Sequence, residues 1–154
     1  MDELWIRETM PAEHDKDFYR WTQQQAAALR GGLFDRLDAP HLAQEIEDLG
    51  HRVKQAVERQ LVRVLVHLLK LKYREEEDAH ACRRWRVSVL DGRHEIAEEL
   101  ADNRSLRDYP ARQLQAAYRH ARRKALVQTG WPVEAFPEVC PWTIARVLDE
   151  DFLP

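Results

Sequence analysis

The apolar positions of the chain recur at helical spacing over its longest continuous pattern. From Pro40 to about Lys72 an apolar side chain returns every three or four residues for more than four heptads. This pattern predicts one long amphipathic helix, which Asp38-Ala-Pro would begin because Asp can cap a helix and Pro fits its first turn. Gly50 lies inside the segment and costs about 1 kcal/mol relative to Ala, so two helices that meet at Gly50 are the alternative. The stripe consists of Leu42, Ile46, Leu49, Val53, Ala56/Val57, Leu61, Val64/Leu65, Leu68 and Leu71.

Shorter helices are predicted on both sides of this segment. The first covers 15–30, with Phe18, Trp21, Gln25/Ala26 and Leu29 on its inner face and a left-handed stop at Gly31-Gly32. Two more are predicted over 80–101 and between Ser105 and Thr129-Gly130, where Ser105 and Asp108 resemble a capping box. A short helix at 141–148 completes the set. No segment alternates with a period of two residues, so we expect no sheet.

These elements predict an all-α helical bundle built along one long central helix, with a short C-terminal helix and a Trp/Pro-rich tail. The length of 154 residues predicts a single domain, 1–154. Within it we expect a loosely ordered N-terminal arm at 1–13 and a tail at 131–154 that packs on the core.

Composition narrows the class of protein. The chain is 44% hydrophobic and 33% charged, with a formal net charge of −3, as in a globular protein. No apolar run approaches the roughly 18–20 residues that span a bilayer, and residues 1–10 do not resemble an export signal. With only Cys82 and Cys140 we expect free thiols and a cytoplasmic location, without membrane association.

Charge is distributed unevenly along the predicted helices. The 80–101 helix starts with Arg and ends with acids, which opposes its macrodipole. If it runs antiparallel to both neighbouring helices, ten cations gather at one pole of the bundle. This basic pole would bind an anionic partner, or would be neutralised by acids at 75–78 and 149–151 of the same chain. The candidate binding residues are Arg83, Arg84, Arg86, Arg119, Arg122, Arg123 and Lys124; Lys70, Lys72 and Arg74 complete the pole.

The sequence contains few candidate catalytic or metal-ligating residues. His67 lies close to the apolar stripe of the long helix, so it is either a core histidine or part of an internal polar site. His41 and Glu45 stand at i and i+4 and could hold a metal ion edge-on, but no third ligand is visible. The two Cys lack paired zinc spacing, and the established catalytic motifs are missing. We therefore predict no catalytic residue, no metal and no cofactor.

Five separated blocks resemble, in the same order, a bacterial family known as domain of unknown function 29. They are Asp17-Phe-Tyr-Arg-Trp-Thr, Leu42-Ala-Gln-Glu-Ile-Glu-Asp-Leu-Gly, His67-Leu-Leu-Lys, Trp85 with 93–96, and the ending Phe136-Pro-Glu-Val-Cys-Pro-Trp-Thr with Val147-Leu-Asp-Glu-Asp-Phe-Leu-Pro. The resemblance covers 15–154. It implies a compact helical domain and brings no activity, substrate or cofactor.

The sequence favours a non-enzymatic interaction or regulatory protein that displays its long helix and basic pole to a protein partner. The exposed half of the long stripe also makes self-association an expectation. The alternative is a nucleic-acid accessory protein whose Arg side chains contact phosphates. An enzyme or ligand-binding protein that uses His67 is the third hypothesis.

Overall fold

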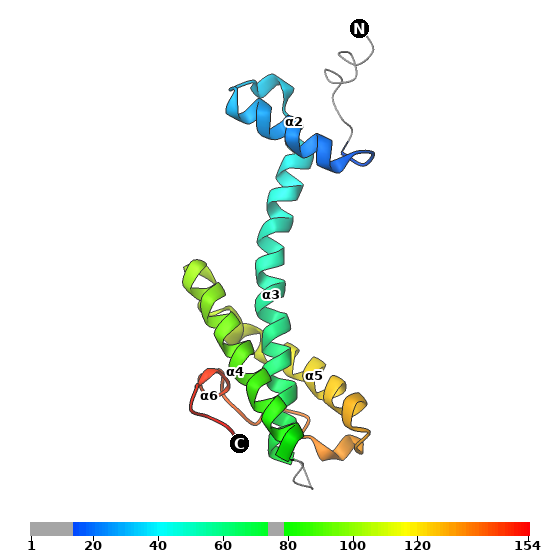
Figure 1. The fold of residues 1–154 in the computed structure, drawn as a ribbon, viewed down its shortest axis with the longest axis vertical. Coiled ribbons are helices and arrows are strands. Elements are labelled where there is room, and N and C mark those ends of the chain that lie inside the picture. The colour runs from blue at the N-terminus through cyan, green and yellow to red at the C-terminus, as the bar shows by residue number, and fades with distance from the viewer. Residues whose placement is uncertain (1–13, 74–78) are drawn as a thin grey trace. The chain divides into compact units, whose positions relative to one another are not determined.

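The structure is a computed structural model that describes residues 14–73 and 79–154 (Figure 1). Every regular element in these two ranges is a helix, which confirms the all-α class. The predicted arm at 1–13, Arg74 and the acidic segment 75–78 lie outside the described residues. The chain divides into two compact units, Met1–Gly50 (unit 1) and His51–Pro154 (unit 2).

Unit 1 contains helix α2, Phe18–Arg30, and the start of α3. The helix begins three residues later than predicted because Asp17 is its cap: the Asp17 Oδ1 accepts a hydrogen bond from the Arg20 N–H at 3.1 Å. The predicted stop is confirmed. The left-handed residue is the second glycine, Gly32, with φ of 66°.

The buried face of α2 differs from the predicted one. Trp21, Gln25 and Ala28 are buried, whereas Phe18 and Leu29 are 47% and 49% exposed. Hydrogen bonds to Asp38 account for this difference. The Gln25 side-chain oxygen accepts a hydrogen bond from the Asp38 N–H at 2.8 Å, and Trp21 Nε1 donates to Asp38 Oδ2 at 3.3 Å. Trp21 and Gln25 are therefore buried as predicted, whereas Ala28 takes the buried position in place of Phe18 and Leu29.

Helix α3, Ala39–Tyr73, confirms the long central helix. It is helical through Gly50, so the two-helix alternative is wrong. Adding a Cβ to Gly50 would meet no atom within 4 Å, which means that no neighbouring segment requires glycine there. Burial along α3 begins at Val57, and the buried side chains are Val57, Leu61, Val64, Leu65, Val66, Leu68, Leu69, Lys70 and Leu71.

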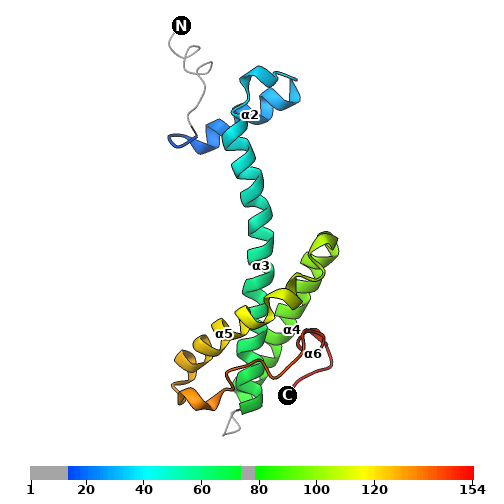
Figure 2. The same cartoon turned by 180° about the vertical axis from the view of Figure 1, so that it is seen from behind.

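In unit 2, helix α4, Ala79–Asp102, runs antiparallel to α3. Arg63 of α3 lies 3.5 Å from Glu95 of α4, whereas Lys70 lies over the ring of Trp85. The two helices pack closely at Gly92, where an added Cβ would come within 2.7 Å of the Val64 side chain. Glycine is therefore what allows this crossing. In both Figures 1 and 2, α4 and α5 lie on opposite sides of α3.

Helix α5, Tyr109–Thr129, runs in the same general direction as α3, since Tyr109 contacts Glu58 and Gln128 contacts Lys70. The predicted capping box is wrong. Ser105 lies in a 3-10 turn, Arg104–Leu106, and the helix starts after Asp108, with Pro110 in its first turn. The predicted end at Gly130 is confirmed by a φ of 69°.

The residues after α5 pack on unit 2 through a short 3-10 helix, Val133–Ala135, and helix α6, Ile144–Leu148. Phe136 and Val147 are fully buried in the core. Arg93 of α4, itself 3% exposed, donates to the carbonyl oxygens of Val147 at 2.7 Å and Phe152 at 2.9 Å. Among the described residues, no helix has the length and hydrophobicity that crossing a membrane requires.

Candidate functional site

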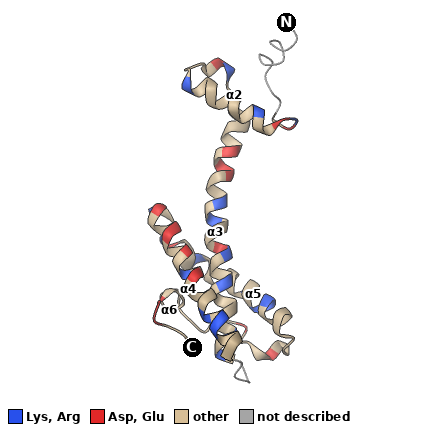
Figure 3. Cartoon of the chain, in the orientation of Figure 1, with Lys and Arg blue, Asp and Glu red and all other residues tan. Residues whose placement is uncertain are grey.

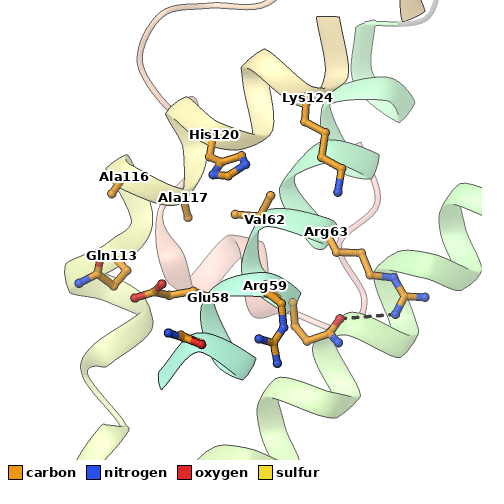
Figure 4. A pocket seen from close by; sticks show the side chains of 11 residues that line it. Glu58, Arg59, Val62, Arg63, Gln113, Ala116, Ala117, His120 and Lys124 are labelled. Carbon is orange, nitrogen blue, oxygen red and sulfur yellow. Dashed lines mark hydrogen bonds between the residues drawn. The ribbon is translucent and has the colours of Figure 1, made fainter. Parts of the chain in front are cut away.

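A groove of about 690 Å³ lies in unit 2 between α3 and α5 (Figure 4). Its floor is apolar, and small side chains of α5 keep it open. Figure 4 shows His120 and Lys124 of α5 on one side and Arg59 and Val62 of α3 on the other. The lining residues are Gln55, Glu58, Arg59, Gln60, Val62, Arg63, Gln113, Ala116, Ala117, His120 and Lys124.

The groove is electrostatically positive. Arg59, Arg63 and Lys124 contribute cations, and Glu58 is the one carboxylate among the lining residues that the structure describes. Glu58 accepts a hydrogen bond from the Tyr109 hydroxyl, which raises the pKa of Tyr109 to about 12 because the carboxylate favours the protonated phenol. Glu58 keeps its negative charge in this hydrogen bond, so the groove has an excess of positive charge and its carboxylate is held at one edge.

Arg63 is also drawn toward α4. Its guanidinium lies 3.5 Å from Glu95 Oε1 and 3.6 Å from Asp91 Oδ2, and all three side chains are at least a third exposed. Exposed pairs of this kind contribute only about 0.2–1 kcal/mol. They leave Arg63 able to turn toward an anion in the groove.

The cationic side chain of Lys70, at the C-terminal end of α3, lies near the cationic side chain of Lys124 in α5. Lys70 donates to Gln128 at 2.6 Å, and its pKa is lowered first by burial and then by the nearby charge of Lys124. Trp85, between Arg84 and Arg86, stacks against the same ammonium at 5.5 Å. Acidic positions gather instead toward the C-terminal end of α4 (Figure 3).

The residues predicted to form the basic pole have different environments. Arg83, Arg84, Arg86, Arg119, Arg123 and Lys124 are exposed, and Lys124 alone among the seven candidates lines the groove. Arg122 is engaged within the fold: its guanidinium donates to the carbonyl oxygens of Phe136 at 3.0 Å and Val133 at 2.6 Å. Sequence reasoning did not select Arg59 and Arg63 as binding residues, although the chain order places both on α3 at i and i+4.

The acidic residues of the C-terminal tail influence the pKa of Arg93 in α4. Asp149 and Glu150 raise the pKa of the Arg93 guanidinium, partly offsetting the lowering by burial. Asp149 also lies 3.4 Å from Arg146. These contacts place the tail acids beside α4 and α6.

His67 is not part of the groove lining. Its Nδ1 is buried without a hydrogen-bond partner. Burial, and after it the charges of Lys70, Arg63 and Lys124, lower the pKa of the imidazole to about 4, so the ring is neutral at pH 7. Among the described residues, the second polar group that an internal site at His67 would need is not found at Nδ1.

A second polar cluster lies in unit 1, around His41 and Glu45. The structure adds His14 and Asp15, which precede α2: the two ring nitrogens of His14 lie 2.8 Å from Asp15 Oδ1 and 2.8 Å from Glu45 Oε1. These hydrogen bonds, first to Asp15 and then to Glu45, raise the pKa of His14. His41 Nδ1 lies 2.7 Å from Asp38 Oδ2. Sequence reasoning found His41 and Glu45 by spacing but missed His14, which is brought in by a tertiary contact.

Both cysteines are free thiols, as predicted. Cys82 is buried in the core, and Cys140 donates to the Trp142 carbonyl oxygen at 3.4 Å. Burial raises the pKa of the Cys140 thiol, which makes the thiolate a minor species at neutral pH. Cys140 therefore packs as a small apolar side chain.

Comparison with known proteins bears on the family alone. Searches of curated proteins and of solved structures gave no significant match. The profile described as "Domain of unknown function DUF29" matches residues 14–153, which covers most of both compact units and the tail held by Arg93. The chain therefore belongs to the DUF29 family.

Proposed function

We propose that this chain is a non-enzymatic protein-interaction domain whose α3–α5 groove binds an acidic segment of a partner protein. One observation carries the proposal: Arg59, Arg63 and Lys124 converge on a groove whose floor is apolar and whose single carboxylate, Glu58, is already engaged by Tyr109. A segment that bears carboxylates and an apolar side chain satisfies both parts of this lining.

The groove fits a polypeptide better than a nucleic acid. Val62, Ala116 and Ala117 form a floor that an apolar side chain can fill, whereas a phosphate backbone has no group for it. The net charge of −3 also opposes the long-range attraction on which nonspecific nucleic-acid binding depends. Exposed Arg119 and Arg123, on the same helix as Lys124, extend the positive surface outside the groove.

Site-specific cross-linking tests the proposal directly. A photoreactive amino acid replaces Gln113 in the groove, and the same amino acid replaces Arg36 of unit 1 as a control. After irradiation in bacterial cells, mass spectrometry identifies the cross-linked peptide. We expect an acidic peptide from one protein at position 113, no such product at position 36, and at least a tenfold loss of it in the Arg59→Glu/Lys124→Glu variant.

The outcome also separates the competing hypotheses. A product at position 113 that nuclease removes would support the nucleic-acid alternative, and binding would then weaken steeply with salt through counterion release. A product that consists of a second copy of this chain would establish self-association. If the charge-reversed variant cross-links as strongly as the wild type, the groove is not the binding surface and the proposal is wrong.

A further inference from the structure

We propose that His14, Asp15 and His41 bind one divalent first-row transition-metal ion in unit 1. One ligand atom from each of the three residues lies within 4.8 Å of the others. The set consists of two imidazoles and one carboxylate, which is the donor chemistry that zinc, iron, nickel and copper sites use. This inference concerns a different part of the molecule from the groove and does not depend on it.

The carboxylates around the histidines hold them in the orientation that a metal site requires. In protein metal sites, a ligating histidine commonly offers one ring nitrogen to the ion while the other is held by a carboxylate. Glu45 lies 2.8 Å from His14 Nε2, and Asp38 lies 2.7 Å from His41 Nδ1. This arrangement directs His14 Nδ1 and His41 Nε2 toward the ion.

Asp15 completes the ligand set. Its Oδ1 lies 2.8 Å from His14 Nδ1, which is close to the spacing of two ligand atoms on one ion: with bonds of about 2.0–2.1 Å, neighbouring ligands are roughly 3–3.4 Å apart. Because the two ring planes are nearly parallel, the His41 ring must tilt as well as move inward to place a nitrogen on the same ion. Three protein ligands leave at least one further position for water or another ligand.

The surroundings shield one side of the proposed site. The two imidazole rings are stacked, with centroids 4.5 Å apart and planes inclined by 13°. The ring of Trp21, 2% exposed, meets His14 edge-on at 4.8 Å, and Phe18 does so at 5.3 Å. Asp15 is exposed, so an ion can enter from the solvent side. Trp21 and Phe18 hold the His14 ring in place, whereas the stacking between His14 and His41 must open when the ion binds.

The experiment is a titration of tag-free, metal-stripped full-length protein with Co²⁺ alone. Co²⁺ is used because its visible absorption reports both binding and coordination by nitrogen and oxygen. We expect saturation at one Co²⁺ per chain, displacement by Zn²⁺, and at least a tenfold loss of affinity in His14→Gln and in His41→Gln. His94→Gln is the control, since His94 is an exposed imidazole beside Glu98 in α4, at 3.4 Å.

Two further variants keep the test decisive if either histidine substitution unfolds unit 1. Asp38→Asn and Glu45→Gln leave all three ligands in place and neutralise the carboxylates that orient the imidazoles, so we expect a loss of roughly 10–100-fold in Co²⁺ affinity. Glu45→Gln is the more selective of the two, because Asp38 also accepts a hydrogen bond from Trp21. Circular dichroism establishes that each variant is folded. Absence of saturable Co²⁺ binding in the wild type, or equal loss in His94→Gln, would show that these residues form an ion-pair cluster only.

Discussion

Arg93 is the residue on which the C-terminal tail depends. It is buried, and its Nε and Nη2 donate to the carbonyl oxygens of Val147 and Phe152, while Nη1 has no partner among the described residues. Both Arg93 and the residues it holds belong to blocks that carry the family resemblance. A single side chain thus links two blocks that are far apart in the sequence. Val147 and Phe152 follow Arg93 by 54 and 59 positions.

Replacing Arg93 by Met should destabilise unit 2 by about 2–4 kcal/mol, because two carbonyl oxygens lose charged donors and remain buried. Urea unfolding measured by tryptophan fluorescence checks this. Arg86→Met, an exposed change in the same helix, should stay within about 0.5 kcal/mol of the wild type. Equal stability of the two variants would contradict the role given to Arg93.

His67 predicts how stability depends on pH. Its pKa is about 4 in the folded chain and about 6.5 when unfolded. Between these values the unfolded chain binds a proton that the folded chain does not, so stability falls as pH decreases from 6.5 to 4. The loss from this residue alone should reach at most about 3 kcal/mol.

The variant His67→Gln should lose this part of the pH dependence, which thermal melts at pH 7, 6, 5 and 4 would measure. Substitution of the exposed His94 by Gln serves as the comparison. If wild type and His67→Gln lose stability in parallel below pH 6.5, the imidazole is not held neutral by its surroundings.

Residues whose environment depends on local spacing could be predicted, and those that depend on tertiary contacts could not. His41 and Glu45 are one helical turn apart, so the sequence alone pairs them. His14 precedes α2 and contacts Glu45 of α3. No periodicity in the sequence indicates that contact. The exposure of Phe18 has the same origin, because hydrogen bonds to Asp38 decide which face of α2 is buried.

At the scale of the elements, two glycines in helices have opposite roles. Gly92 lies where α4 crosses α3, and a Cβ there would meet Val64, which is fully buried and branched. Gly50 lies in α3 with open space around the position of a Cβ. From the sequence alone, Gly92 and Gly50 cannot be told apart, because each is simply a glycine that weakens a helix.

Gly92→Ala should therefore destabilise the protein and Gly50→Ala should stabilise it. Overpacking at Gly92 costs about 1–3 kcal/mol, which exceeds the roughly 1 kcal/mol that alanine gains in a helix. At Gly50 the gain of up to about 1 kcal/mol is unopposed. Urea unfolding of the two variants side by side tests the signs, and stabilisation by Gly92→Ala would refute the close crossing.

The helices themselves were predictable because their signals are local. The apolar stripe predicts α3 to within one residue at each end, and Gly130 ends α5 as expected. The start of α5 was mispredicted because Ser105 offers a cap in sequence, while Pro110 fits only the first turn of a helix. Crossing angles and the groove could not be predicted, because they depend on Gly92, Ala116 and Ala117 in three dimensions.

At the scale of the whole molecule, the main cluster of buried apolar side chains among the described residues lies in unit 2. The buried core cluster starts at Val57 and ends at Val147. Unit 1 is held instead by Trp21 and by polar contacts to Asp38 and Glu45. The two units should therefore differ in how they respond to truncation.

A fragment comprising residues 51–154 should fold cooperatively, with a urea midpoint close to that of the intact chain, because it retains the whole core cluster. Circular dichroism and tryptophan fluorescence should give coincident transitions. A fragment that ends at Asp149 lacks the Phe152 carbonyl oxygen and therefore one hydrogen bond from Arg93. We expect its urea midpoint to be lower than that of the intact chain. Loss of cooperativity in 51–154 would show that unit 1 is required for the core.

The dependence of Arg93 on residues 147 and 152 also sets an order of events during synthesis. A nascent chain can complete unit 1 early, whereas the core cannot close until Phe152 has left the ribosome. At 5–20 residues per second, the stripe of α3 that ends at Leu71 waits roughly 4–16 seconds for its last covering residues. During that interval Leu61, Leu65 and Leu68 are covered by residues of α4 and α5 alone, and Phe136 and Val147 of the tail close the core last.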